Sequence, residues 1–271
     1  MVELPSEPFS LPPGPAGPPR APRLKVIVFD DDPTGSQTVH SAPLLLRWDA
    51  STLAAGLRHP SPLLFLLANT RALDPDEARG RLREICRALV PALEEARQAG
   101  AIDRWLVVSR GDSTLRGHFP LEVEVIDQEL GPFDATFLAP AFLEGGRTTV
   151  EGVHRLAGAP VHQSAFARDS LFGYGTSRLA DWAQDKSGGR IAAAAVQHIG
   201  LAELEPSAAA QLALRHRLEA LTGNPLVVVD AERPAQLATF GAVVRELVAG
   251  PQDPPHRLLF QSCLLYTSDA A

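Results

Sequence analysis

Short apolar runs in this sequence are followed at once by side chains that can bind or activate a small polar molecule. Three adjacent carboxylates, Asp30, Asp31 and Asp32, come directly after the run at 25–29. Carboxylates this close repel one another, so folding alone does not favour the cluster, and hydroxyl binding, metal binding and general-base work are its functional interpretations. The structural alternative is a helix N-cap, because Asp and Thr both cap helices well.

Later apolar runs are followed by residues of the same kinds. They are Asn69 and Arg71 after 63–67, then Arg110, Asp112, Ser113, Arg116 and His118 after 105–108, then Arg147 after 136–138. An arginine can hold a carboxylate or phosphate through two parallel hydrogen bonds, whereas carboxylates accept from sugar hydroxyls. The pattern therefore predicts one binding site built from several loops.

The elements that must position these loops alternate between strands and helices. Apolar runs predict strands at 25–29, 44–46, 63–67, 105–108, 136–138, 191–196, 226–229 and 258–260. Apolar spacing and end signals predict helices at 75–99, 207–221 and 234–249, and the spacing of the first makes Cys86 a core residue. Continuous apolar runs are typical of strands covered on both faces, so we expect an α/β fold with a doubly wound, mostly parallel sheet and helices on both faces. Ligands of such sheets bind at the carboxyl ends of the strands.

Composition excludes several classes of function. The 271 residues carry 25 basic and 32 acidic side chains, a net charge of −7, which argues against binding to nucleic acid. The two cysteines cannot form a zinc site or a disulfide framework, and the eight histidines lack metal-ligand spacing, so no metal site is predicted. The sequence has no apolar run near the roughly 18–20 residues of a membrane helix and no signal-peptide pattern, so we expect a cytoplasmic protein without a membrane partner.

The two ends differ from the rest of the chain. Residues 1–23 hold 8 of the 24 prolines and show no apolar periodicity, and we interpret them as a disordered tail. We interpret 24–262 as one α/β domain. Residues 263–271 resemble a translated sequencing-adaptor scar, which predicts a non-native end on a truncated protein.

Five motifs occur in an order that is more specific than any one of them. They are Asp31-Asp32-Pro33-Thr34-Gly35, Asn69-Thr70-Arg71, Asp112-Ser113-Thr114-Leu115-Arg116-Gly117, Pro140-Ala141-Phe142 with Gly146-Arg147, and Phe166-Ala167-Arg168-Asp169 with Phe172-Gly173-Tyr174. Over about 24–260 they resemble the N-terminal acid-sugar-binding domain of the four-carbon acid sugar kinase family. The resemblance implies ATP-dependent phosphorylation of the terminal hydroxyl of tetronates such as threonate, erythronate or 3-oxo-tetronate. It also implies that ATP and Mg²⁺ bind through a C-terminal nucleotide-binding domain, and this sequence shows no glycine-rich phosphate loop of its own.

On this interpretation a carboxylate orients or deprotonates the reacting hydroxyl, and we assign that role to Asp32, with Asp112 as the alternative. The residues expected to bind the sugar acid are Asp31, Asp32, Asn69, Arg71, Arg110, Asp112, Ser113, Arg116 and Arg147. We expect His118 to donate to substrate, and Asp30 to be structural and to face backbone amides of the next helix. A homodimer is the default oligomer.

Two other classes of function compete with this one. The first is a phosphatase similar to the haloacid dehalogenases, with Asp30 as nucleophile, Asp32 as general acid, and Lys186 and Asp230 completing the site. The second is a binding module without catalysis, which is what we expect of this chain when it is isolated from a nucleotide-binding domain.

Overall fold

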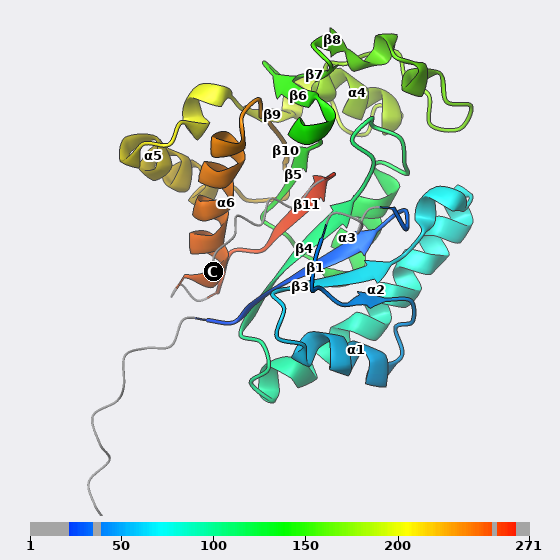
Figure 1. The fold of residues 1–271 in the computed structure, drawn as a ribbon, viewed down its shortest axis with the longest axis vertical. Helices are drawn as coiled ribbons and strands as arrows, with labels where there is room; N and C mark the ends of the chain where they lie inside the picture. The colour runs from blue at the N-terminus through cyan, green and yellow to red at the C-terminus, as the bar shows by residue number, and fades with distance from the viewer. Residues whose placement is uncertain (1–21, 35–38, 251–253, 264–271) are drawn as a thin grey trace, which may run out of the picture.

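An eight-stranded parallel sheet forms the middle of the fold (Figure 1). The computed structural model describes residues 22–34, 39–250 and 254–263. The strand order is β2-β3-β1-β4-β11-β5-β10-β9, and every pairing registered in this sheet is parallel. The strands are β1 (Leu24–Asp30), β2 (Leu44–Leu45), β3 (Leu63–Leu67), β4 (Arg104–Arg110), β5 (Ala135–Ala139), β9 (Gln197–Ile199), β10 (Leu226–Val229) and β11 (Leu258–Ser262). The predicted α/β, doubly wound class is confirmed.

Helices cover both faces of this sheet (Figure 1). The first face carries α1 (Ala50–Arg58), α2 (Pro75–Gln98), α3 (Leu121–Leu130) and α4 (Leu179–Lys186), and the second carries α5 (Ala208–Glu219) and α6 (Pro234–Ala249). Alternate residues of a strand point to opposite faces, so central strands such as β4 and β5 contribute to two separate cores.

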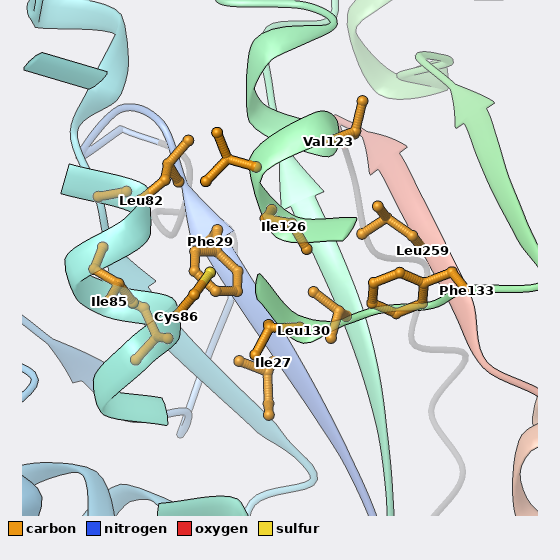
Figure 2. Close-up of a cluster of buried hydrophobic side chains, with 14 of the residues drawn as sticks. Ile27, Phe29, Leu82, Ile85, Cys86, Val123, Ile126, Leu130, Phe133 and Leu259 are labelled. Carbon is orange, nitrogen blue, oxygen red and sulfur yellow. The ribbon is translucent and has the colours of Figure 1, made fainter. Parts of the chain in front are cut away.

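The larger core lies between the sheet and helices α2 and α3 (Figure 2). Ile27 and Phe29 of β1 pack there against Leu82 and Cys86 of α2 and Ile126 of α3. Cys86 is fully buried, and burial raises the pKa of its thiol to about 12, so it is a core residue, as predicted.

Helix α2 confirms the end signals in the sequence. The Asp74 carboxylate accepts from the backbone amides of Asp76 and Glu77, and Glu77 accepts in return from the amide of Asp74 at 3.3 Å. This capping box satisfies amides that the first helical turn leaves without partners. Helices α5 and α6 likewise occupy the predicted segments.

The strand predicted at 191–196 is wrong. That segment contains a 3₁₀ turn at Ala193–Ala195, and the edge strand β9 follows it. Ala192, Ala194 and Ala195 are exposed, because four consecutive alanines offer too little apolar surface to hold a strand against the core.

A second, smaller sheet was missed by the sequence analysis, as were helices α1, α3 and α4. Strands β6 (Arg147–Val150), β7 (Val153–Leu156) and β8 (Ala159–Pro160) pair antiparallel, and the turn between β6 and β7 has positive φ at Glu151 and Gly152. Polar residues dominate this segment, which hides its alternation. The small sheet lies beyond the carboxyl end of β5 in Figure 1.

The predicted tails lie almost entirely outside the described residues, which include only Pro22 and Arg23 of the first and Cys263 of the second. Their assignment, and the division into 1–23, 24–262 and 263–271, stay predictions. No helix in the described part of the chain is long and apolar enough to cross a membrane.

Candidate functional site

Three of the predicted loops meet because β1 lies between β3 and β4. In the register of the sheet, Asp30 is opposite Leu67 of β3 and Arg110 of β4. The residues that follow these three positions therefore leave the sheet side by side at its carboxyl edge. After β1 the chain continues to β2 and β3 on one side of β1, whereas β4 lies on the other side. The strand order therefore reverses at β1, which makes this edge the switch point of the sheet.

Asp31 and Arg71 form the central ion pair of the site. Arg71 donates from Nε to Asp31 Oδ2 at 2.9 Å and from Nη2 to Oδ1 at 2.6 Å. The Asp31 side chain is 1% exposed and that of Arg71 is 18% exposed. Burial raises the pKa of Asp31, and the fork from Arg71 opposes that rise. The pair is short, two-pronged and shielded from water, so it holds the two loops in a fixed relation.

Asp30 is fully buried, and its partner differs from the one that we expected. Arg110 Nη1 lies 3.3 Å from Asp30 Oδ1, so an arginine of the neighbouring strand faces it, in place of the expected backbone amides of a helix. Burial raises the pKa of Asp30 to about 6, and the charge of Arg110 opposes this. Arg110 also donates from Nε to the Cys263 carbonyl at 3.0 Å.

Asp32 is the most accessible of the three carboxylates, with 27% of its side chain exposed. Its Oδ1 accepts from the backbone amide and hydroxyl of Thr34, and its Oδ2 lies 3.4 Å from Arg71 Nη1. Burial raises the pKa of Asp32, but the hydrogen bonds from Thr34 outweigh it and the pKa falls below its usual value. Asp32 is therefore ionised at neutral pH, with one oxygen directed to Arg71.

A second ion pair lies on the loop after β4. Arg116 donates from Nε to Asp112 Oδ2 at 2.6 Å, and Thr114 donates to the same oxygen. The Arg116 guanidinium lies over the ring of Phe166, 4.8 Å from its centroid. Burial raises the pKa of Asp112, but the bonds from Arg116 and Thr114 lower it below its usual value.

The small sheet and the segment after it hold this loop in place. His154 of β7 is fully buried and donates from Nε2 to the Ser113 carbonyl at 2.7 Å, and Tyr174 donates its hydroxyl to the Thr114 carbonyl at 2.6 Å. Leu115 has a φ of 65°, a conformation that the surrounding contacts must maintain.

Asp31 and the second ion pair line one small cavity, together with Glu122. The volume of this cavity that the centre of a water molecule can occupy is about 20 Å³. That is enough for a water molecule and too little for a sugar acid. A sugar acid that uses these groups therefore needs more room than this cavity has in the present arrangement.

Three other predicted residues are bonded to backbone groups outside the two ion pairs. Arg147, in the small sheet, donates from Nη1 to the carbonyl of Gly145 and lies over Phe142. Asn69 contributes its backbone amide to the Asp30 carbonyl and adopts a positive φ of 51°. His118 lines the cavity, yet its Nε2 is bonded to the Leu73 carbonyl at 3.0 Å. The structure thus unites Asp31, Asp32, Arg71, Arg110, Asp112 and Arg116 around β1 and β4.

The residues required by the phosphatase alternative have other partners. Lys186 Nζ donates to the carbonyls of Phe172 and Gly173 at 2.8 and 2.9 Å. Asp230 accepts from the backbone amides of Glu151 and Gly152. Neither side chain completes a site with Asp30, so this geometry does not support that alternative.

The carboxylates that could bind Mg²⁺ are already neutralised by arginine, as the Asp31–Arg71 and Asp112–Arg116 pairs show. In residues 22–34, 39–250 and 254–263, no group of three or more His, Cys, Asp or Glu side chains is placed to hold a metal ion. In this arrangement the buried Asp31 and the paired Asp112 therefore already have arginine as their counter-charge.

Comparison with known proteins identifies the family. The family model described as a sugar-binding N-terminal domain matches residues 26–253. D-erythronate kinase of Heliobacterium modesticaldum is 31% identical over 243 residues, which is 84% of this chain and 50% of that kinase. The chain belongs to the four-carbon acid sugar kinase family, as its N-terminal sugar-binding domain. It spans about half the length of this curated relative.

Solved structures resemble this sugar-binding domain in fold. A protein from Bordetella bronchiseptica, a domain-swapped dimer with bound citrate, has a TM-score of 0.61 and 22% identity over 90% of this chain and 55% of its own. A putative tRNA synthase from Salmonella typhimurium has a TM-score of 0.58 and 18% identity over 88% of this chain and 52% of its own.

The sequence analysis of the sugar-binding domain missed Glu122. This residue is 4% exposed in the first turn of α3 and lines the cavity. Glu122 and Glu124 both lie among the apolar Val123, Val125 and Ile126, so no local signal in the sequence marks Glu122 as the buried one.

Proposed function

We propose that this chain is the sugar-acid-binding part of an ATP-dependent kinase that phosphorylates four-carbon acid sugars at the terminal hydroxyl. Threonate, erythronate and 3-oxo-tetronate are the proposed substrates. The supporting observation is the pair of arginine–aspartate contacts, Asp31–Arg71 and Asp112–Arg116, at one carboxyl edge of the sheet. Such an edge offers donors to a carboxylate and acceptors to hydroxyls within a few ångströms of each other.

Arg116 is the arginine best placed to bind the carboxylate of the sugar acid. It uses Nε toward Asp112, and within the described residues its two terminal nitrogens have no hydrogen-bond partner. The Phe166 ring supports the face of its guanidinium. A ligand carboxylate can therefore take the terminal nitrogens and replace Asp112 as the partner, which frees the Asp112 oxygens for a hydroxyl.

Asp32 is the proposed base, with Asp112 as the alternative. Asp32 is ionised, partly exposed, and next to the ion pair of Asp31 and Arg71. As the terminal hydroxyl oxygen forms its bond to the γ-phosphorus of ATP, the hydroxyl proton passes to the Asp32 carboxylate. The bond between the γ-phosphorus and the bridging oxygen breaks, and ADP leaves with its electron pair. ATP and Mg²⁺ are proposed to be bound by the rest of the whole protein, so the chain alone is expected to bind its substrate without turnover.

The solved relatives agree with a hydroxy-carboxylate ligand. The structure from Bordetella bronchiseptica has bound citrate, itself a hydroxy-carboxylate, in a domain-swapped dimer. We extend the proposal for this chain to a homodimer.

Isothermal titration calorimetry of this chain with threonate, erythronate and ATP tests the proposal. We expect a four-carbon acid to bind and ATP to bind weakly or not at all. Arg116→Ala should weaken acid binding by about ten- to a hundredfold, the usual value of one charge-assisted contact.

Arg215→Ala is the matched control. Arg215 also donates from Nε to a carboxylate four residues away, that of Glu219, but on the exposed surface of α5. It should leave binding unchanged. Tight ATP binding, or no response to any four-carbon acid in a folded sample, would contradict the proposal.

A further inference from the structure

A buried carboxyl group, Glu122, lies beneath the candidate site and has no part in the proposed phosphoryl transfer. Its Oε1 accepts from the Thr70 hydroxyl at 2.5 Å, and its Oε2 accepts from the Ser109 hydroxyl at 3.1 Å. Thr70 and Ser109 are themselves at most 1% exposed. Thr70 precedes Arg71, and Ser109 precedes Arg110, so Glu122 connects helix α3 to both arginine-bearing segments.

Glu122 has no positively charged partner of its own among the neighbouring described residues. The charged or titratable groups around it are Asp31 from the end of β1, Arg71 from the turn after β3, Asp112, Arg116 and His118 from the loop after β4, and Cys263 directly after β11. Helix α2, which packs on α3, contributes apolar side chains such as Leu82 to the shared core (Figure 2).

The nearby arginines are already engaged with other carboxylates. Arg71 forms its fork with Asp31, and Arg116 is paired with Asp112. Glu122 is left with two hydroxyl partners and a carboxylate neighbour. Burial, and after it the charge of Asp31, raise the pKa of Glu122 to about 7 against the opposing effects of the two hydroxyl bonds and of Arg71.

We propose that Glu122 is a neutral positioning residue, and that its ionisation weakens the binding of an acidic sugar at this site. The protonated carboxyl can donate to one hydroxyl and accept from the other, and it adds no charge to the site. The ionised form places a second negative charge beside Asp31, in the cavity that the proposed anionic ligand must approach. The inference rests on the proposed function, because it takes a sugar acid as the ligand.

Calorimetric titration of the chain with erythronate at pH 6 and pH 8 tests the coupling. Binding to the natural chain should weaken by about tenfold over this range, as expected for one added charge a few ångströms from an anion in a partly shielded site. Glu122→Gln should keep the affinity seen at pH 6 and lose most of the pH dependence, because the amide is neutral and can still accept from one hydroxyl and donate to the other.

Glu124→Gln is the matched control. Glu124 lies in the same helical turn, but its carboxylate is 32% exposed and paired with Arg190. This variant should retain the pH dependence of the natural chain. A pH dependence that Glu122→Gln leaves intact, or a natural chain that binds equally at both pH values, would overturn the inference.

A second measurement without ligand separates this inference from the proposed function. A group whose pKa is raised by folding favours the folded state at low pH, and that advantage is lost as pH rises toward the folded pKa. Between pH 5 and pH 7, the unfolding equilibrium constant of the natural chain should therefore rise by about fortyfold relative to that of Glu122→Gln. A constant ratio would show that Glu122 is ionised throughout and would overturn the inference. If neither erythronate nor any other four-carbon acid binds to either protein, the proposed function is refuted and, with it, the coupling.

Discussion

Removal of Arg71 should expose the energetic cost of burying Asp31. The Asp31 side chain is 1% exposed and receives two hydrogen bonds from Arg71, at 2.6 and 2.9 Å. Loss of one partner of a buried ion pair costs about 3–5 kcal/mol, because the other charge stays in a poorly solvating environment. Arg110 Nη1 remains 3.7 Å from Asp31, so we expect Arg71→Ala to lower the free energy of unfolding by about 3 kcal/mol, the lower end of that range.

The cost should also depend on pH. Without Arg71, burial is opposed by Arg110 alone, and the pKa of Asp31 rises further above that of the unfolded chain. A raised folded pKa means that stability is lost as pH increases, so the variant should be more destabilised at pH 8 than at pH 5. Asp31→Asn in the same background should recover part of the loss, since it removes the unpaired charge.

Urea unfolding of the natural chain and the variant at both pH values measures this. The control is Arg87→Ala, because Arg87 makes a similar fork to Glu129, at 3.1 and 3.2 Å, with its own side chain 69% exposed. Glu129 keeps a second arginine, Arg83, at 3.6 Å after this change, so the control should change stability little. A loss for Arg71→Ala as small as that of the control, or one that grows toward pH 5, would refute the reasoning.

Two other perturbations address the chemistry and the support of the site. In a full-length kinase with this domain, Asp32→Asn should lower turnover by about a hundredfold or more, whereas normal turnover in both Asp32→Asn and Asp112→Asn would remove the assignment of the base. Burial lowers the pKa of His154 to about 4, so its contribution to stability is present above the unfolded pKa near 6.5 and is lost as pH falls from there toward 4. His154→Gln should flatten that part of the stability profile in urea unfolding, and an unchanged profile would mean that burial does not hold His154 neutral.

Local sequence already determined the main strands, the class of sheet and much of the site. The continuous apolar run at 63–67 is buried at four of its five residues, as expected of a parallel strand that is covered on both faces. Capping at Asp74 is equally local, because it involves residues within one turn. Polar residues directly after such runs must then leave the sheet at its carboxyl edge, which is why Asp31 and Arg71 could be assigned to one site.

Tertiary structure decided which of these residues face one another. Strand order places β1 between β3 and β4, and this order depends on pairings between segments far apart in the chain. It pairs Asp31 with Arg71 and Asp30 with Arg110. The sequence alone, with three adjacent aspartates, does not determine which aspartate pairs with which arginine. The partners of Arg147, a loop carbonyl and an aromatic ring, depend on a small sheet whose polar strands carry little periodicity.

Glu122 shows the same division most clearly. In the sequence it is one acidic residue among several at a helix start, and nothing local distinguishes it from the exposed Glu124 two positions later. Its chemistry comes from the packing of α3 against the sheet, which places the carboxyl of Glu122 beneath Asp31 and turns that of Glu124 toward Arg190. Burial and neighbouring charge are properties of the folded environment, and they determine the pKa of a carboxyl group far more strongly than its position in the chain does.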